Sequence, residues 1–411
     1  MLKKSYPITR CQVSNFKNLE TILNLGYLPP VNDFKKIGTT QKESKFYPTE
    51  LLYCNKSKLF QLGFVVSKDI LFPKSYPYTS STTKILRDNF LDLSTKCKKR
   101  FNLKKNDLIV DIGSNDGNLL SHFKDFSKVL GVTPEEIGKI AIKRGIPTIL
   151  KYFDENVSKF IVKKHGKAKI VTATNVFAHI DNPNFLTKNI INILEDDGIF
   201  ISESHYILPL IKTIQYDTIY HEHLRYYSMQ SLNYLLNKNN LYIFDVEEIG
   251  THGGSIRVYA SKKGKYRVSK NVNSIFNKEK KLLNLSEIKK FKNRVLISKL
   301  QLLDMIYNIK KRKKSISGVS APSRASTLIN YVGIDENIID NILEIPGSYK
   351  IGKYLPGTKI PVVNENILFK KKKPDYLLLL SWHISDELIK NIRNKGYKGK
   401  FIIPLPKPKI V

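Results

Sequence analysis

Short apolar segments that alternate with helical patterns organise the middle of the chain. The first lies in DLIVDIGSNDGNLL (107–120), where a β-branched run ends at Asp111, a glycine turn follows, and a helical pattern begins. Similar runs recur as KVLGVT (128–133), KIVTATNVF (169–177) and GIFISES (198–204). Strands that alternate with helices predict a mainly parallel α/β sheet, with ligands at the carboxyl ends of its strands.

The flanking patterns predict further parts of the chain. Residues 1–85 are punctuated by proline and carry only short apolar runs, which predicts a loop-rich N-terminal lobe. Residues 276–314 combine helical periodicity with heavy charge and are expected to be linking helices. SISGVSA as a strand, PSRAS as a loop, TLINYVGI as a helix and DYLLLLSW as a strand predict a second Rossmann-like domain over 315–411. The parallel sheet is then assigned to 86–275.

The composition indicates a folded protein of several domains. The chain has 411 residues, of which 41% are hydrophobic, and this length predicts two or three domains. Three cysteines cannot form a disulfide framework, which favours a reducing compartment. No apolar h-region follows MLKKSYPITR, and no apolar run reaches the roughly 18 residues that span a bilayer. We expect a cytoplasmic monomer without membrane contact.

The net charge of +33 raises the question of nucleic-acid binding. The basic residues are spread along the whole chain beside abundant Asn and Ile, which is typical of compositional drift rather than of a binding patch. We therefore expect no nucleic-acid partner, although the positive field favours anionic small molecules.

Histidines cluster in one part of the sequence. Five of the eight lie between positions 179 and 252: His179, His205, His221, His223 and His252. Histidine is the side chain that titrates near neutral pH, so this clustering predicts proton transfer or metal binding.

Several blocks carry a family resemblance over nearly the whole chain. They are YPTELLYC, YPYTSST, VDIGSNDGNLL, NVFAHIDNP, YDTIYHEHLRYYS, GTHGGSIRVY, GKYLPGTKIP and DYLLLLSW. With these blocks the chain resembles the S-adenosylmethionine-dependent C-methyltransferases that act on nucleotide-linked 4-keto-deoxysugars. The resemblance implies a class I methyltransferase sheet, S-adenosylmethionine as cofactor and a nucleotide-diphosphate sugar as substrate. The alternative is a non-catalytic nucleotide-sugar binding relative, or a methyltransferase that acts on another atom.

This chemistry requires a base near the carbon beside the ketone and a donor at the ketone oxygen. The resemblance implies His223 as the base, with Tyr220 and Glu222 orienting it or binding sugar hydroxyls. It also implies His179 as the donor to the oxyanion, together with either Tyr76 or Tyr78 from the N-terminal lobe. For His205 and His221 we expect structural roles.

The cofactor is expected at the glycine turn. The residues assigned to the methionine end and the sulfonium are Asp111, Gly113, Ser114, Asn115 and Gly117. The family has an acidic residue after the second strand to bind the ribose, but this chain has Thr133 there. Either Glu135 swings in, or threonine and backbone hold the ribose. Ala173 and Asn175 are expected to contact the adenine edge or the amino-acid portion.

The N-terminal lobe of the family holds zinc through two CxxC pairs. Here the pairs read CQVS and CNKS, so Ser14 and Ser57 stand where cysteines are expected. A neutral hydroxyl is a poor zinc ligand, and we therefore expect no metal.

Three further residues are predicted to bind the substrate. His252 and Arg257 lie in the HGGSIRVY block, and Arg324 lies in GVSAPSRASTLIN (318–330). Small residues at the start of the predicted helix expose backbone N–H groups, and Arg324 could add a bidentate contact to a diphosphate.

Overall fold

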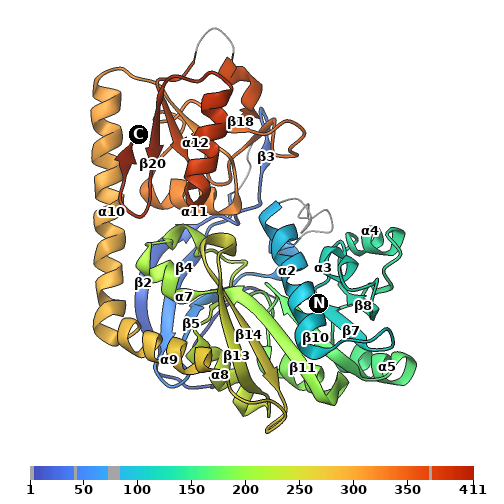
Figure 1. The fold of residues 1–411 in the computed structure, drawn as a ribbon. Coiled ribbons are helices and arrows are strands. Elements are labelled where there is room, and N and C mark those ends of the chain that lie inside the picture. Colours follow the sequence, from blue (N-terminus) through green and yellow to red (C-terminus); the bar gives the residue numbers. More distant parts are fainter. Residues whose placement is uncertain (1–3, 41–43, 73–83, 370–372) are drawn as a thin grey trace.

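The computed structural model describes residues 4–40, 44–72, 84–369 and 373–411 (Figure 1). Three large sheets organise these residues, and a two-stranded sheet pairs β1 (Tyr6–Pro7) with β6 (Phe64–Val65). Each large sheet takes most of its strands from one part of the chain, but two of the three also contain one strand from a distant part of the sequence.

The central sheet has seven strands in the order β13-β14-β11-β10-β7-β8-β9. All are parallel except β14, which is antiparallel to β11 and β13. Because every position of β7 is buried, a continuous apolar run such as LIVDI suits this central place. The strands are β7 (Leu108–Ile112), β8 (Lys128–Val132), β9 (Thr148–Ile149), β10 (Ala168–Thr174), β11 (Leu194–His205), β13 (Tyr242–Ile249) and β14 (Ser255–Ser261). The predicted parallel sheet is confirmed.

Helices and turns connect the strands of the central sheet. The helices are α2 (Lys84–Phe101), α3 (Asn118–Ser121), α4 (Gly138–Lys143), α5 (Glu155–His165), α6 (Pro183–Ile193), α7 (Ile207–Lys212) and α8 (Met229–Lys238). Two 3-10 turns, η2 (Tyr216–Thr218) and η3 (Thr251–Gly253), lie beyond β11 and β13. Strand order reverses between β7 and β10, and ligands of such sheets bind at this switch point.

The N-terminal segment contains more strand than the sequence predicted. β2 (Glu20–Leu28), β4 (Tyr47–Cys54) and β5 (Leu59–Leu62) form an antiparallel sheet, completed by β12 (Arg225–Tyr226) from far along the chain. The lobe also keeps long loops, as predicted, but the sheet was not expected, because a long-range partner and a buried apolar face stabilise runs that are short in sequence. The short helix α1 (Lys68–Leu71) follows.

The C-terminal sheet has eight strands in the order β21-β20-β19-β15-β16-β18-β17-β3. Its bounds are β15 (Ile316–Val319), β16 (Ile342–Glu344), β17 (Lys353–Tyr354), β18 (Pro361–Asn364), β19 (Tyr376–Leu379), β20 (Lys400–Ile403) and β21 (Lys409–Ile410). The edge strand β3 (Lys35–Lys36) comes from the N-terminal segment. Its helices and turns are α11 (Ser323–Val332), η4 (Glu365–Phe369), η5 (Trp382–Ile384) and α12 (Ser385–Asn394).

Two helices link the central and C-terminal sheets. They are α9 (Lys270–Leu282) and the long α10 (Leu285–Lys311), where linking helices were predicted. Figure 1 shows α10 running along one side of the molecule, and it contacts both β2 and α11. The domain boundaries at 85, 275 and 314 stay predictions. β3 precedes residue 85 but joins the C-terminal sheet, and β12 follows it but joins the sheet of the N-terminal segment.

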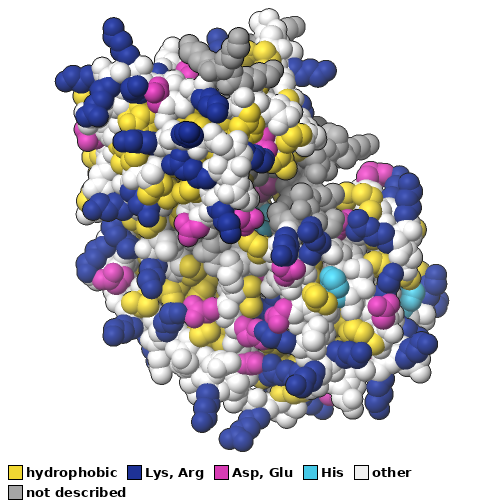
Figure 2. All heavy atoms as spheres, turned by 45° about the horizontal axis from the view of Figure 1, so that its top comes forward, with side chains coloured by type: hydrophobic (Ala, Val, Ile, Leu, Met, Phe, Trp, Pro, Cys, Tyr) yellow, Lys and Arg dark blue, Asp and Glu magenta, His cyan; other side chains and the backbone are white. Residues whose placement is uncertain are grey.

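Lys and Arg side chains are scattered over the face drawn in Figure 2, mixed with other residue types. Among the helices of the described residues, none is long and apolar enough to cross a membrane.

Candidate active site

The turn after β7 places its residues in left-handed conformations. Gly113 and Gly117 have φ of 75° and 77°, and Asn115 has φ of 50°. A Cβ at Gly113 would lie 2.5 Å from Cγ2 of Val176, so the turn packs tightly on the segment after β10. The Oγ of Ser114 is buried without a hydrogen-bond partner among the described residues. A bound ligand could satisfy that hydroxyl, so the turn fits the cofactor predicted for it.

Residues of β7 and β10 lie beside this turn because the two strands are parallel neighbours. Asp111 accepts a hydrogen bond of 2.6 Å from Oγ1 of Thr172, and burial raises the pKa of its carboxyl to about 7. A cation nearby would favour the ionised carboxylate. Asn175 has φ of 58°, and its N–H donates to the carbonyl of Glu203 at 2.7 Å. The side chain of Ala173 is fully buried in the core, so only its backbone can face a ligand.

The end of β8 carries the replacement for the family's acidic residue. Thr133 is fully buried, and its Oγ1 donates to Oε2 of Glu135 at 3.0 Å. The hydrogen bond holds a carboxylate near the strand end, where ribose hydroxyls bind in related folds. Of the two alternatives for the ribose, this geometry favours Glu135.

His223 is held in one tautomer. Its Nδ1 lies 3.2 Å from the carbonyl oxygen of Thr218, and a carbonyl can only accept, so Nδ1 carries the proton. Nε2 is therefore the acceptor and lies 3.3 Å from the hydroxyl of Tyr220. Burial, and then the neighbouring His179 and His205, lower the pKa of His223 well below its usual value. A neutral imidazole with a lone pair on Nε2 can act as a general base.

His179 lies against His223, with 5.1 Å between the ring centroids. Its Nδ1 donates to the carbonyl of Glu222 at 2.7 Å, and burial lowers its pKa to about 4. The neutral ring therefore presents an acceptor at Nε2, and the donor that we predicted for the oxyanion is already bonded to backbone. Glu222 is itself buried and accepts from Nδ2 of Asn32 at 2.7 Å, so the N-terminal segment reaches this site.

The remaining histidines of the cluster differ in their surroundings. Nε2 of His221 lies 3.0 Å from Oγ1 of Thr49, which joins it to β4, as expected for a structural role. The ring of His205 lies 6.4 Å from that of His223, and burial lowers its pKa to about 3. His252 adopts φ of 56° within η3, and its contact with a substrate stays a prediction. Tyr76 and Tyr78 lie outside the described residues.

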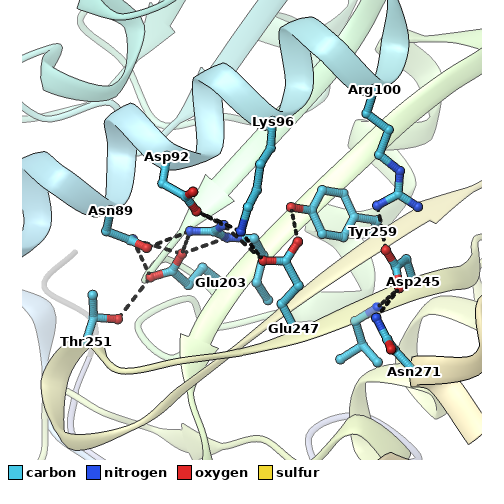
Figure 3. Close-up of polar contacts among 12 residues, drawn as sticks. Asn89, Asp92, Lys96, Arg100, Glu203, Asp245, Glu247, Thr251, Tyr259 and Asn271 are labelled. Carbon is cyan, nitrogen blue, oxygen red and sulfur yellow. Dashed lines mark hydrogen bonds and ion pairs between the residues drawn. The ribbon is translucent and has the colours of Figure 1, made fainter.

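Arg257 has a different role from the one predicted. Its guanidinium is fully buried, where Nε and Nη2 donate to Oε2 of Glu203 at 3.1 and 2.9 Å. Nη2 also donates to Oδ1 of Asn89, while Asn89 and Thr251 donate to the same carboxylate. Figure 3 labels Asn89, Glu203 and Thr251, which come together from α2, β11 and η3, while Arg257 belongs to β14. The predicted substrate contact is not supported, because the charge is already neutralised inside the protein.

Arg324 is likewise engaged. It lies in the first turn of α11, where a loop was predicted, and is 6% exposed. Nε and Nη2 donate to the two carboxylate oxygens of Asp217 at 2.8 and 2.9 Å. The bidentate geometry expected for a diphosphate is thus used on a carboxylate of the same chain, and the prediction that Arg324 binds substrate is corrected.

The residues of the expected zinc site lie together. Oγ of Ser57 is 3.1 Å from Sγ of Cys11, and Oγ of Ser14 is 3.5 Å from Sγ of Cys54. Hydroxyl–thiol hydrogen bonds thus take the place of thiolate–metal bonds, and the site does not fit zinc. No group of three or more His, Cys, Asp or Glu side chains suited to a metal occurs among the residues that the structure describes.

We expect purified protein to contain well under one zinc per chain after dialysis, because two thiolates rarely hold structural zinc alone. The double variant Ser14→Cys, Ser57→Cys should bind about one zinc per chain, since four thiolates then surround one position. Metal analysis of both proteins checks this. Stoichiometric zinc in the unmodified protein would contradict it.

Several residues of the site were not found from the sequence. They are Asn32, Asp217, Thr218 and Glu203. Asp217 and Thr218 lie within the block YDTIYHEH, which had already indicated a functional site. The partner of Asp217 is distant in sequence, and Thr218 contacts His223 through its backbone carbonyl, which the residue type does not reveal. Asn32 is 190 residues from Glu222 and carries no such signal.

Three family models match successive parts of the chain. "Putative zinc binding domain" matches residues 11–72, "Methyltransferase domain" matches 78–246, and "C-methyltransferase C-terminal domain" matches 250–406. The C-methyltransferase NovU of Streptomyces niveus is 28% identical to this chain, and the match covers 98% of this chain and 97% of that protein.

Solved structures of other methyltransferases match the central part. Magnesium protoporphyrin IX methyltransferase of Synechocystis PCC 6803 with bound SAH is 13% identical and has a TM-score of 0.34, covering 43% of this chain and 83% of that one. An S-adenosylmethionine-dependent methyltransferase of Clostridium acetobutylicum is 14% identical with a TM-score of 0.35, covering 45% and 94%.

Proposed function

Because the chain belongs to the S-adenosylmethionine-dependent C-methyltransferases, we propose that it methylates a ring carbon beside the ketone of a nucleotide-linked 4-keto-deoxysugar. The observation that carries the proposal is the tautomer of His223, whose Nδ1–H is bonded to Thr218 and whose Nε2 is left as an acceptor beside the hydroxyl of Tyr220. A base that is neutral at working pH is what removal of a proton beside a ketone requires. The proposal includes a monomer acting in the cytoplasm.

In this proposal the chain's own residues handle the proton. Nε2 of His223 takes it from the carbon beside the ketone. The hydroxyl of Tyr220, which lies beside Nε2, donates to the ketone oxygen as charge develops there. Glu222, which accepts a hydrogen bond from Asn32 of the N-terminal segment, orients the base or binds sugar hydroxyls. Tyr76 or Tyr78 adds a further contact, as the family resemblance implies.

The cofactor site is proposed at the edge of the central sheet. S-adenosylmethionine supplies an electrophilic methyl group on a positively charged sulfur. Asp111, Ser114 and the backbone of the glycine turn would hold its methionine end. Glu135 would accept from the ribose hydroxyls, and Asn175 would contact the adenine edge. The parallel strands β7, β10 and β11 end at one edge of the sheet, and His205 at the end of β11 lies beside His223. A methyl donor bound at that edge would therefore lie on the same side of the sheet as the proposed base.

Glu135→Gln should weaken S-adenosylmethionine binding about tenfold to a hundredfold, because a hydrogen bond to a charged group contributes about 1.5–3 kcal/mol. A thermal-shift titration measures the change, since ligand at 100 times its dissociation constant adds about 2.7 kcal/mol of stability. Glu136→Gln is the matched control, because the side chain of Glu136 is 68% exposed and pairs with Lys139. No stabilisation of the unmodified protein would count against the proposed cofactor. Equal binding by both variants would remove Glu135 from the site.

A further inference from the structure

The turn η2 lies between the candidate base and the C-terminal domain. On one side, the carbonyl of Thr218 accepts hydrogen bonds from Nδ1 of His223 at 3.2 Å and from the hydroxyl of Tyr226 at 3.1 Å. The preceding residue, Asp217, contacts α11 and η5 of the C-terminal domain. Two neighbouring residues thus connect the base to a different sheet.

The carboxylate of Asp217 is fully buried and satisfied by donors from the C-terminal domain. Arg324 binds both of its oxygens, and Nε1 of Trp382 donates to Oδ2 at 2.7 Å. The guanidinium lies 5.0 Å from the centroid of the Trp382 ring, and its Nη1 donates to Nδ1 of His383 at 2.8 Å. A bidentate pair in a buried setting fixes both distance and orientation.

The residues before Asp217 are held from the same helix. The ring of Tyr216 meets that of Tyr331 in α11 edge to face, with 5.0 Å between centroids. Oε1 of Gln215 accepts from Nη2 of Arg324 at 3.3 Å, while its Nε2 donates to the carbonyl of Gly253 at 2.7 Å. Three consecutive residues therefore contact α11, which leaves η2 little freedom to rotate.

We propose that Arg324 is a positioning residue for His223: by clamping Asp217 it fixes the carbonyl of Thr218, and that carbonyl keeps the imidazole proton on Nδ1. The inference rests on the proposed function, in which Nε2 of His223 is the base. If the carbonyl turned away, the proton could move to Nε2 and the base would be lost. Arg324 touches neither the reacting carbon nor the cofactor in this scheme, so its loss should lower kcat and leave KM unchanged.

The tautomer can be measured without any substrate. Full-length protein with ¹⁵N-labelled histidine reports which ring nitrogen carries the proton, and His223→Gln identifies the signals of His223. We expect the Nδ1–H form in the unmodified protein and a mixture of both forms in Arg324→Gln. Arg324→Lys should be intermediate, because lysine keeps the charge but cannot make the bidentate contact with the carboxylate of Asp217. Arg393→Gln is the control, since Arg393 bonds to the carbonyls of Tyr397 and Gly399 within the C-terminal domain.

The same variants are compared in exchange of the hydrogen beside the ketone with deuterated solvent. Arg324→Gln should slow exchange about fivefold to tenfold, the effect of one lost hydrogen bond, and Arg324→Lys should recover part of it. If Arg324→Gln leaves both the tautomer of His223 and the exchange rate unchanged, Arg324 does not position His223. If that variant does not fold, Trp382→Phe removes one donor to Asp217 and is judged by the same two outcomes. Absence of exchange in the unmodified protein would overturn the proposed function instead, while the tautomer measurement would still decide the clamp.

Discussion

His223→Ala should abolish methyl transfer while S-adenosylmethionine binding stays unchanged. A positioned general base contributes about 10²–10⁴-fold to the rate, and the described contacts of His223 are with Thr218, Tyr220 and neighbouring rings rather than with the glycine turn. Exchange of the hydrogen beside the ketone with deuterated solvent should disappear with it. A second histidine variant, His165→Ala at the end of α5, should leave both measurements unchanged.

The pH dependence of that exchange has a definite direction. Burial lowers the pKa of His223 well below 6.5, and the base works only when neutral. The rate should therefore stay level as the pH falls from 8 through 6.5, and decline only at lower pH. An acid limb centred at 6.5 or above would contradict this assignment. Exchange that persisted in His223→Ala would direct attention to His179, whose Nε2 is also an acceptor.

Arg257→Met should lower the free energy of unfolding by about 3–5 kcal/mol. Removing one partner of a buried ion pair leaves the other charge without compensation, and Glu203 is fully buried. Denaturant unfolding followed by circular dichroism measures the loss. The network in Figure 3 joins α2 to β11 and η3, so the effect should extend over the central sheet.

The double variant Arg257→Met, Glu203→Leu tests the cause of that loss. Replacing both members of a buried pair by apolar side chains is often nearly neutral. The double variant should therefore be more stable than Arg257→Met alone, although Asn89 and Thr251 lose an acceptor. The free energy of unfolding lost in the double variant is compared with the sum of the losses in Arg257→Met and Glu203→Leu. A loss at least as large as that sum would show that packing, not charge, accounts for the effect.

The sequence predicted the parts of the fold that local patterns determine. The apolar runs that became β7, β8, β10 and β11 were identified because each is short, β-branched and bounded by turns. The sheet of the N-terminal segment was missed, since its fourth strand comes from Arg225 and Tyr226 and no local pattern reports such a partner.

The candidate site divides in the same way. The block YHEH identified His223, and its pairing with Tyr220 is local in sequence. Arg324 was assigned to the substrate because an arginine at a helix start suits a diphosphate. Its actual partner, Asp217, is 107 residues away, and only the folded chain brings the two together. Charge that looks free in a sequence can be neutralised by any residue that the fold places beside it.

The pairing of β3 with β17 has a consequence for how the protein is made on the ribosome. β3 is synthesised near the start of the chain, whereas the strand that it pairs with follows roughly 300 residues later. At a synthesis rate of about 5–20 residues per second, β17 is made tens of seconds after β3. During that time the unpaired backbone groups of β3 can bind other chains. Both residues of β3, Lys35 and Lys36, are lysines, and lysine side chains on an edge strand oppose aggregation.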